Sequence, residues 1–221
     1  MVAKVHPSVP FAAPSSPVTG LASLSERCGA CERCGLAAGR QQVVISRGEA
    51  TARLMLIGEA PGAQEDGCGQ PFVGRAGQLL DQLLAEAGLD SARDAYLCNV
   101  IKCRPPANRR PSGAEIAACR PWLEEQIAAV DPPLILLLGA TALAGVLGVK
   151  QGLSRLRGQW MPWQGRWLMP LFHPSYLLRF PNEAEGSPRW LTRADLAAVH
   201  QRLNSMGLVH GRRPPPLAPV P

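Results

Sequence analysis

The chain of 221 residues is 46% hydrophobic and 18% charged, and its formal net charge is +6. This composition excludes a wholly disordered protein, supports a sizeable hydrophobic core and, at this length, suits one large domain. No apolar run reaches the roughly 18–20 residues that cross a bilayer, so we expect no membrane partner, and the basic excess favours an anionic one.

Proline-rich segments stand at both ends of the chain. Residues 1–22 contain four prolines and residues 208–221 contain five, and neither segment sustains a hydrophobic period. We therefore predict two flexible tails around a single domain at residues 23–207. The first segment also lacks the apolar stretch of a secretory signal, which predicts a cytoplasmic protein.

Short apolar runs alternate with amphipathic segments through the domain. Ser112 and Glu115 form a capping-box pattern that opens a helix, and Asp131 with two following prolines stops it. The alternation predicts an α/β fold, a three-layer αβα sandwich with a central, mainly parallel four-stranded sheet. The predicted strands are residues 54–57, 95–101, 134–138 and 167–172, and the other predicted helices are residues 76–87, a short helix from Gly139, and residues 189–205.

The loops at the carboxyl ends of these strands carry the candidate functional residues, because open parallel sheets bind ligands at that edge. The loop from Gly58 to Gly77 holds six glycines, so its backbone can approach a ligand closely. It has neither the phosphate-loop nor the dinucleotide-binding glycine pattern. Its carboxylates, Glu59 and Glu65, are either functional or solvated, and its aromatic Phe72 is either functional or a core anchor.

The loop after the last predicted strand runs from His173 to Arg179, and prolines at 174 and 181 are expected to hold it extended. A histidine at the carboxyl end of a strand can donate a hydrogen bond to a developing anion. Leu177 and Leu178 beside an arginine suit insertion into a nucleic-acid stack, with core packing as the alternative.

Seven cysteines, an odd number, argue against a disulfide framework. Cys31 and Cys34 have the spacing of a metal-binding pair, and Cys28 with Cys31 has the same spacing. With Cys103 and Cys119, such a pair could bind an iron–sulfur cluster or a structural zinc. The second pair is not a zinc knuckle, which favours a [4Fe–4S] cluster, and ordinary buried thiols are the alternative.

Three segments together resemble the family 4 uracil-DNA glycosylases, the iron–sulfur members of their superfamily. They are residues 58–80, 99–108 and 173–179, and the likeness extends in the same order over about residues 28–206. The resemblance implies a central parallel sheet between helices and a [4Fe–4S] cluster that braces loops near DNA. It also favours the pair of Cys31 and Cys34 over that of Cys28 and Cys31, because the family's second cysteine is followed by one residue and then leucine, as Cys34 is here. Which of Cys28 and Cys34 completes the pair with Cys31 stays open. The implied cluster ligands are Cys31, Cys34, Cys103 and Cys119.

The same resemblance implies roles for the pocket residues. Phe72 would stack on uracil, His173 would face its O2 atom, and Asn99 would read its edge. An amide can pair with O4 and N3–H of uracil at once, whereas cytosine presents the opposite pattern. His173 would stabilise the leaving base anion, and either Glu59 or Glu65 would stabilise the sugar cation and orient water. The implied uracil-binding residues are Gly58, Glu59, Ala60, Phe72, Asn99 and His173.

Basic and loop residues near these motifs are expected to contact DNA, either at its phosphates or by entering the stack. They are Lys102, Arg104, Arg109, Arg110, Ser175, Leu177, Leu178 and Arg179.

The resemblance implies a monofunctional, monomeric enzyme that flips uracil out of DNA, hydrolyses its N-glycosidic bond and leaves an abasic site for base excision repair. No lysine stands in a nucleophile's place in these motifs, so we expect no lyase step. The enzyme would act on uracil-containing DNA in the cytoplasm, at the nucleoid, and its tails would be free to bind replication or repair proteins.

Two alternatives stay open. One is a relative that crosslinks to the abasic product through a histidine in a basic loop, although residues 104–118 contain no histidine. The other is a non-catalytic iron–sulfur module that only binds DNA.

Overall fold

The computed structural model describes residues 20–149 and 152–206, and both predicted tails lie almost entirely outside these ranges. Helix α1 begins at Leu21, within the last two residues of the predicted N-terminal tail. The strands are β1 (Arg47–Gly48), β2 (Leu54–Gly58), β3 (Ala95–Asn99), β4 (Leu134–Leu138), β5 (Met161–Trp163) and β6 (Arg166–Leu171). The α-helices are α1 (Leu21–Gly29), α2 (Ala63–Cys68), α3 (Arg75–Glu86), α4 (Gly113–Val130), α5 (Ala140–Leu147), α6 (Leu153–Leu156), α7 (Pro174–Arg179) and α8 (Pro188–Ser205), and the short 3-10 helices are η1 (Gly35–Ala38) and η2 (Pro106–Asn108).

The predicted four-stranded parallel sheet is present, extended by a short strand at each edge. The strand order is β1-β3-β2-β4-β6-β5, in which the four central strands run parallel and the two edge strands pair antiparallel. β1 and β5 contain only two and three residues, too few for an alternating hydrophobic pattern to be seen in the sequence. The four long strands appear in the sequence as apolar runs because helices cover both faces of the sheet.

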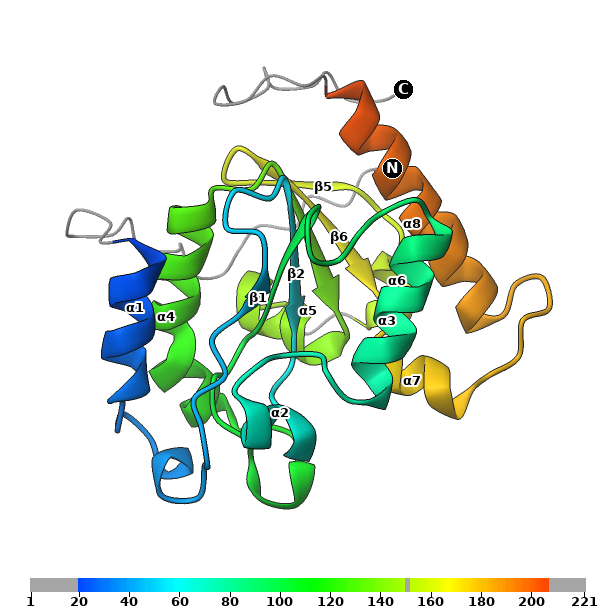
Figure 1. Cartoon of the computed structure of the whole chain (residues 1–221). Helices are drawn as coiled ribbons and strands as arrows, with labels where there is room; N and C mark the ends of the chain where they lie inside the picture. The colour runs from blue at the N-terminus through cyan, green and yellow to red at the C-terminus, as the bar shows by residue number, and fades with distance from the viewer. Residues whose placement is uncertain (1–19, 150–151, 207–221) are drawn as a thin grey trace.

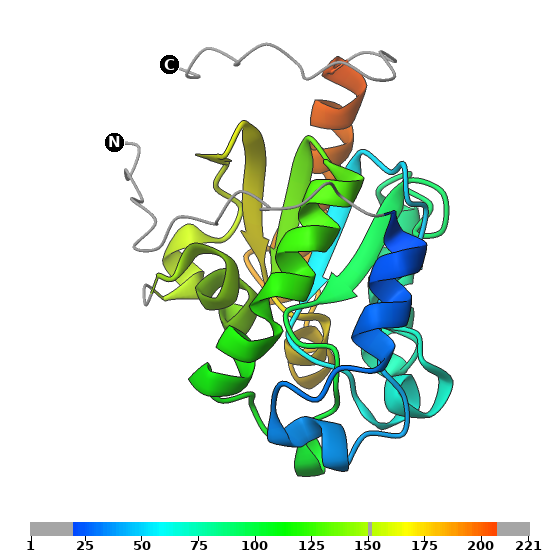
Figure 2. The same cartoon turned by 90° about the vertical axis from the view of Figure 1, so that its left-hand side faces the viewer.

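Helices form a layer on each face of the sheet, as predicted (Figure 1). Alternate residues of β2 enter different cores: Met55 and Ile57 pack on the side of α1 and α4, and Leu54 and Leu56 on the side of α3 and α8. Figure 2 views the first of these faces, with α1 and α4 in front of the sheet. The αβα sandwich is therefore confirmed.

The segment after β6 is helical, so the prediction of an extended loop there is wrong. Pro174 occupies the first position of α7, where its missing N–H costs no helical hydrogen bond. His173 caps this helix, because its side chain accepts a hydrogen bond from the backbone N–H of Ser175. A proline that looked like a barrier to helix formation instead marks where the helix begins.

The predicted helix between Ser112 and Asp131 is confirmed. The Ser112 hydroxyl accepts from the backbone N–H of Glu115, and the Glu115 carboxylate accepts from that of Ser112. Across the described ranges, no helix is both long enough and apolar enough to cross a membrane.

Candidate active site

Several predicted site residues converge where β2 and β3 end. Gly58 and Asn99 are partners across these parallel strands. A Cβ atom added to Gly58 would lie 2.4 Å from Cζ of Phe72 and 2.5 Å from Oδ1 of Asn99. The ring and the amide therefore come together over the backbone of Gly58, which must lack a side chain. The rings of Phe72 and His173 are 6.3 Å apart between centroids, so His173 belongs to the same cluster.

Asn99 is almost fully buried, and a buried lysine supports its backbone. The Lys102 ammonium donates to the Asn99 carbonyl oxygen at 2.6 Å, and only 1% of Lys102 is exposed. The prediction that Lys102 contacts a DNA phosphate is therefore wrong: its four-carbon side chain turns inward to the end of β3.

Phe72 is held in a backbone conformation that side-chain-bearing residues rarely adopt, with φ of 57°. The Glu65 carboxylate maintains it by accepting hydrogen bonds from the backbone N–H groups of Gly62, Val73 and Gly74. These bonds join the two ends of the loop that carries Phe72. Glu65, predicted as one of two possible catalytic carboxylates, is thus occupied by three backbone donors and positions the aromatic ring.

Glu59 has a different setting, at the end of β2. Its carboxylate accepts a hydrogen bond from the hydroxyl of Thr141, near the start of α5. Its negative charge acts on His173 and favours the protonated imidazole, although burial outweighs this and lowers the pKa of His173. Of the two predicted carboxylates, Glu59 is the one whose charge reaches His173.

The hydrogen bonds of His173 indicate which of its two ring nitrogens carries the proton. Its Nδ1 accepts from the backbone N–H of Ser175 at 3.2 Å and lies 2.8 Å from the Ser175 hydroxyl. A ring nitrogen that accepts a hydrogen bond carries no proton, so in the neutral imidazole the proton sits on Nε2. Because burial lowers the pKa of His173 below its ordinary 6.5, the neutral form prevails at pH 7.

Leu177 is fully buried, with 0% exposure, in the core beneath α7. The prediction that it enters DNA is therefore wrong, because a helical turn directs this side chain toward α3 and the sheet. Leu178 is half-buried and packs against the same core. The exposed side chains on this segment are Ser175, Arg179 and, just beyond the helix, Phe180 at 48% exposure.

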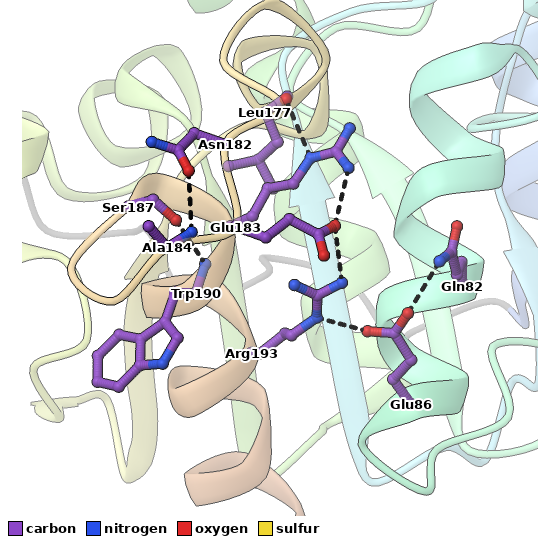
Figure 3. Close-up of polar contacts among 10 residues, drawn as sticks. Gln82, Glu86, Leu177, Asn182, Glu183, Ala184, Ser187, Trp190 and Arg193 are labelled. Atoms are coloured by element: carbon purple, nitrogen blue, oxygen red, sulfur yellow. Dashed lines mark hydrogen bonds and ion pairs between the residues drawn. The ribbon is translucent and has the colours of Figure 1, made fainter.

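An ion-pair network fixes the connection between α7 and α8, as Figure 3 shows. The Glu183 carboxylate pairs with Arg189 at 3.2 Å and with Arg193 at 3.1 Å. Arg193 also pairs with Glu86 of α3 at 2.7 Å, where Gln82 donates as well. The connection between α7 and α8, which follows His173, is thereby tied through Arg193 to α3, the helix that follows Phe72.

The predicted basic residues between β3 and α4 have distinct partners. Arg109 forms two hydrogen bonds with the Glu115 carboxylate, and Arg104 donates to the side chain of Asn108. The pairing with Arg109 is the main reason that the pKa of Glu115 falls to about 2. Arg110 is exposed, and its Nε donates to the hydroxyl of Thr141.

Cysteines line a small, partly open pocket between η1 and α4. We call this the cysteine cavity, and its cysteines are Cys28, Cys31, Cys34, Cys103 and Cys119. It contains the four predicted ligands and also Cys28, so its lining admits either cysteine register. The remaining two cysteines stay apart: Cys98 is buried within β3, and Cys68 is exposed.

Three of the four predicted ligand sulfurs accept hydrogen bonds from nitrogen. Trp122 Nε1 donates to Cys31 at 3.3 Å, the backbone N–H of Lys102 donates to Cys119 at 3.3 Å, and Arg40 lies 3.6 Å from the sulfur of Cys103. Burial raises the pKa of Cys119 to about 11, although the charge of Lys102 acts in the opposite direction. Within the described ranges, no three His, Cys, Asp or Glu side chains are grouped tightly enough to hold a metal ion.

Sequence reasoning missed Thr141, which is 3% exposed and bonded to Glu59. A signal for it was present, because Thr141 follows the carboxyl end of β4 at the edge where ligands bind. The role of Lys102 had no such signal, since a lysine in a basic loop ordinarily faces solvent.

Comparison with known proteins assigns the chain to a family. Residues 45–197 match the family model described as the uracil DNA glycosylase superfamily. The chain is 47% identical to the type-4 uracil-DNA glycosylase of Thermotoga maritima over 71% of this chain and 82% of that protein. It is 40% identical to that of Pyrobaculum aerophilum over 73% and 86%, and 38% identical to that of Saccharolobus solfataricus over 68% and 74%.

We predict that Gly58→Ala destabilises the protein by several kcal/mol, because the new methyl group would overlap both Phe72 and Asn99. Gly67→Ala is the matched control: a Cβ there meets nothing within 4 Å, and alanine favours the helix α2. Urea unfolding of the two variants would compare them. Equal free energies of unfolding would contradict the close approach at Gly58.

Proposed function

Because the chain belongs to the uracil DNA glycosylase superfamily, and to its type-4 branch, we propose that it excises uracil from DNA in base excision repair. The observation that carries the proposal is the meeting of an aromatic ring, a buried amide and a histidine at the carboxyl ends of β2, β3 and β6. The reaction is hydrolysis of the bond between the base and deoxyribose, which leaves an abasic site.

Recognition of uracil would rest on Asn99 and Phe72. Uracil must leave the base stack before its glycosidic bond can be reached, and stacking on an aromatic ring recovers about 1–3 kcal/mol. The Asn99 side chain can accept from N3–H and donate to O4 at once. Cytosine in its place would leave these buried groups unpaired, so the amide would discriminate against it.

Bond cleavage would rest on His173 and Glu59. As the bond between C1′ of the sugar and N1 of the base breaks, its electron pair stays with the base and the sugar becomes cationic. The Nε2–H of neutral His173 would donate to the O2 atom of the developing base anion. The Glu59 carboxylate would stabilise the sugar cation and orient the water whose oxygen bonds to C1′.

The reaction would end at the abasic site, without a lyase step. Lys102 is the only lysine in the described ranges, and its ammonium is buried against the Asn99 carbonyl. A buried, engaged amine is unable to attack the sugar.

DNA would bind along the edge of the sheet that bears this pocket. Arg104, Arg110 and Arg179 would contact phosphates there, and Ser175 lies on the same edge. Leu177 is buried, so the exposed ring of Phe180 would stack on the DNA bases in its place. The enzyme would work as a monomer at the nucleoid.

A [4Fe–4S] cluster in the cysteine cavity is part of the proposal. The cysteine cavity gathers all four proposed ligands, Cys31, Cys34, Cys103 and Cys119, around one space. Its lining offers cysteine sulfurs with nitrogen donors, the surroundings typical of such clusters. Cys31, Cys34, Cys103 and Cys119 would be the ligands, and the bound cluster would brace η1 against α4 without taking part in the cleavage.

We predict that the wild-type protein, incubated with a uracil-containing oligonucleotide and then treated with alkali, yields a strand break at the uracil. Asn99→Ala should lower the single-turnover rate about 100-fold, because two hydrogen bonds to the base are lost. Asn204→Ala, on the exposed side of α8, is the control. No break with wild type would favour the DNA-binding module, and protein trapped on DNA would favour the crosslinking relative.

We predict that the excision rate stays level as the pH falls from 8 to about 6.5 and declines only at lower pH. The sign follows from the lowered pKa of His173, which keeps the imidazole neutral down to a lower pH than usual. Single-turnover rates across this range would test it. A rate that rises as the pH drops through 6.5 would show that the protonated ring is the active form.

We predict that Cys34→Ala abolishes iron binding, whereas Cys28→Ala and the exposed-site control Cys68→Ala retain it. The reason is that one cluster takes four thiolates, and the proposed register leaves Cys28 out. Iron and sulfide per chain, with the visible absorbance of anaerobically purified protein, would measure this. Stoichiometric zinc in place of iron would contradict the cluster, and iron lost only from Cys28→Ala would reverse the register.

A further inference from the structure

Thr141 stands between a basic residue on the DNA-facing edge and the carboxylate beside His173. Its hydroxyl oxygen accepts from Nε of Arg110 at 3.1 Å, and the hydroxyl donates to Oε2 of Glu59. The direction of both bonds is fixed, because a guanidinium only donates and an ionised carboxylate only accepts. The single hydroxyl proton of Thr141 is therefore committed to Glu59.

We propose that Thr141 is a positioning residue that sets the orientation of the Glu59 carboxylate, and that Arg110 links this orientation to DNA binding. The inference rests on the proposed function, since it concerns how the same site is ordered. Glutamate has three rotatable side-chain bonds, so its carboxylate needs a fixed partner to stay aligned. Thr141 supplies one, because it is 3% exposed and near the N-terminus of α5, directly after β4.

Arg110 would connect a DNA phosphate to the hydrogen-bonded series of Thr141 and Glu59. Its Nε donates to Thr141, and within residues 20–149 and 152–206 no group accepts from its two terminal Nη groups, which would be able to donate to a phosphate. The neighbouring Arg109 differs, because both of its Nη groups are committed to Glu115. A phosphate bound to Arg110 would hold the guanidinium against Thr141 and, through it, the Glu59 carboxylate. DNA binding would in this way complete the alignment of the catalytic group.

The test separates alignment from folding and from binding. Thr141→Val keeps the shape of the side chain and removes the hydroxyl, and Thr141→Ser restores the hydroxyl. Thr192→Val is the matched control, because Thr192 is also 3% exposed and donates to a backbone carbonyl within α8, away from the site. Single-turnover excision of uracil at saturating enzyme, the dissociation constant for uncleaved DNA and urea unfolding would be measured for each variant.

We expect Thr141→Val to lower the single-turnover rate about 10- to 100-fold, the effect of losing a hydrogen bond to a charged group, with DNA affinity unchanged. Thr141→Ser should recover most of the rate, and Thr192→Val should match wild type. Thr141→Val combined with Glu59→Gln should be no slower than Glu59→Gln alone, because Thr141 acts through Glu59. Arg110→Ala should weaken binding and also slow the reaction at saturation.

Each contrary result has a distinct meaning. An active wild type with an unimpaired Thr141→Val, a Thr141→Ser as slow as Thr141→Val, or strictly additive effects with Glu59→Gln would overturn the positioning role. An Arg110→Ala variant that only binds more weakly would overturn the link to DNA. A wild-type protein that releases no uracil would overturn the proposed function itself, and this inference with it.

Discussion

The buried ammonium of Lys102 joins the two functional regions of the molecule. It donates to the carbonyl oxygen of Asn99, while the backbone N–H of the same residue donates to the Cys119 sulfur. A buried charge is costly unless it is hydrogen-bonded, so the Lys102 ammonium has to stay on the Asn99 carbonyl. Because the backbone of Lys102 is bonded to Cys119, the end of β3 and the wall of the cysteine cavity move together. The position of the Asn99 side chain therefore depends on how the cysteine cavity is packed, although the two lie on different elements.

Sequence reasoning found the architecture and the loops of the site because both follow from pattern and topology. The apolar runs predicted the four parallel strands, and the rule that ligands bind at their carboxyl ends pointed to the loops after Gly58, Asn99 and Phe172. The roles of the residues in these loops came from the family resemblance. Sequence reasoning failed where a residue's role depends on whether its side chain points inward or toward solvent. Lys102 and Leu177 stand among residues that suit DNA contact, yet both point inward. Burial of single side chains depends on tertiary packing, which local sequence does not encode.

The two carboxylates of the glycine-rich loop show how geometry separates chemically similar groups. Nothing in the sequence distinguished the roles of Glu59 and Glu65. In the structure, the Glu65 carboxylate accepts hydrogen bonds from three backbone N–H groups and so shapes the loop. Glu59 keeps a single described side-chain partner, Thr141, and acts electrostatically on His173. Glu65 is therefore engaged in shaping the loop, whereas Glu59 has its carboxylate beside His173.

The left-handed backbone at Phe72 has a consequence for stability. Such a conformation costs on the order of 1–3 kcal/mol and persists only where surrounding contacts enforce it. The Phe72 ring is thereby fixed in place by the fold itself. Replacements that relax this backbone would stabilise the chain and release the ring from its position beside Gly58 and His173.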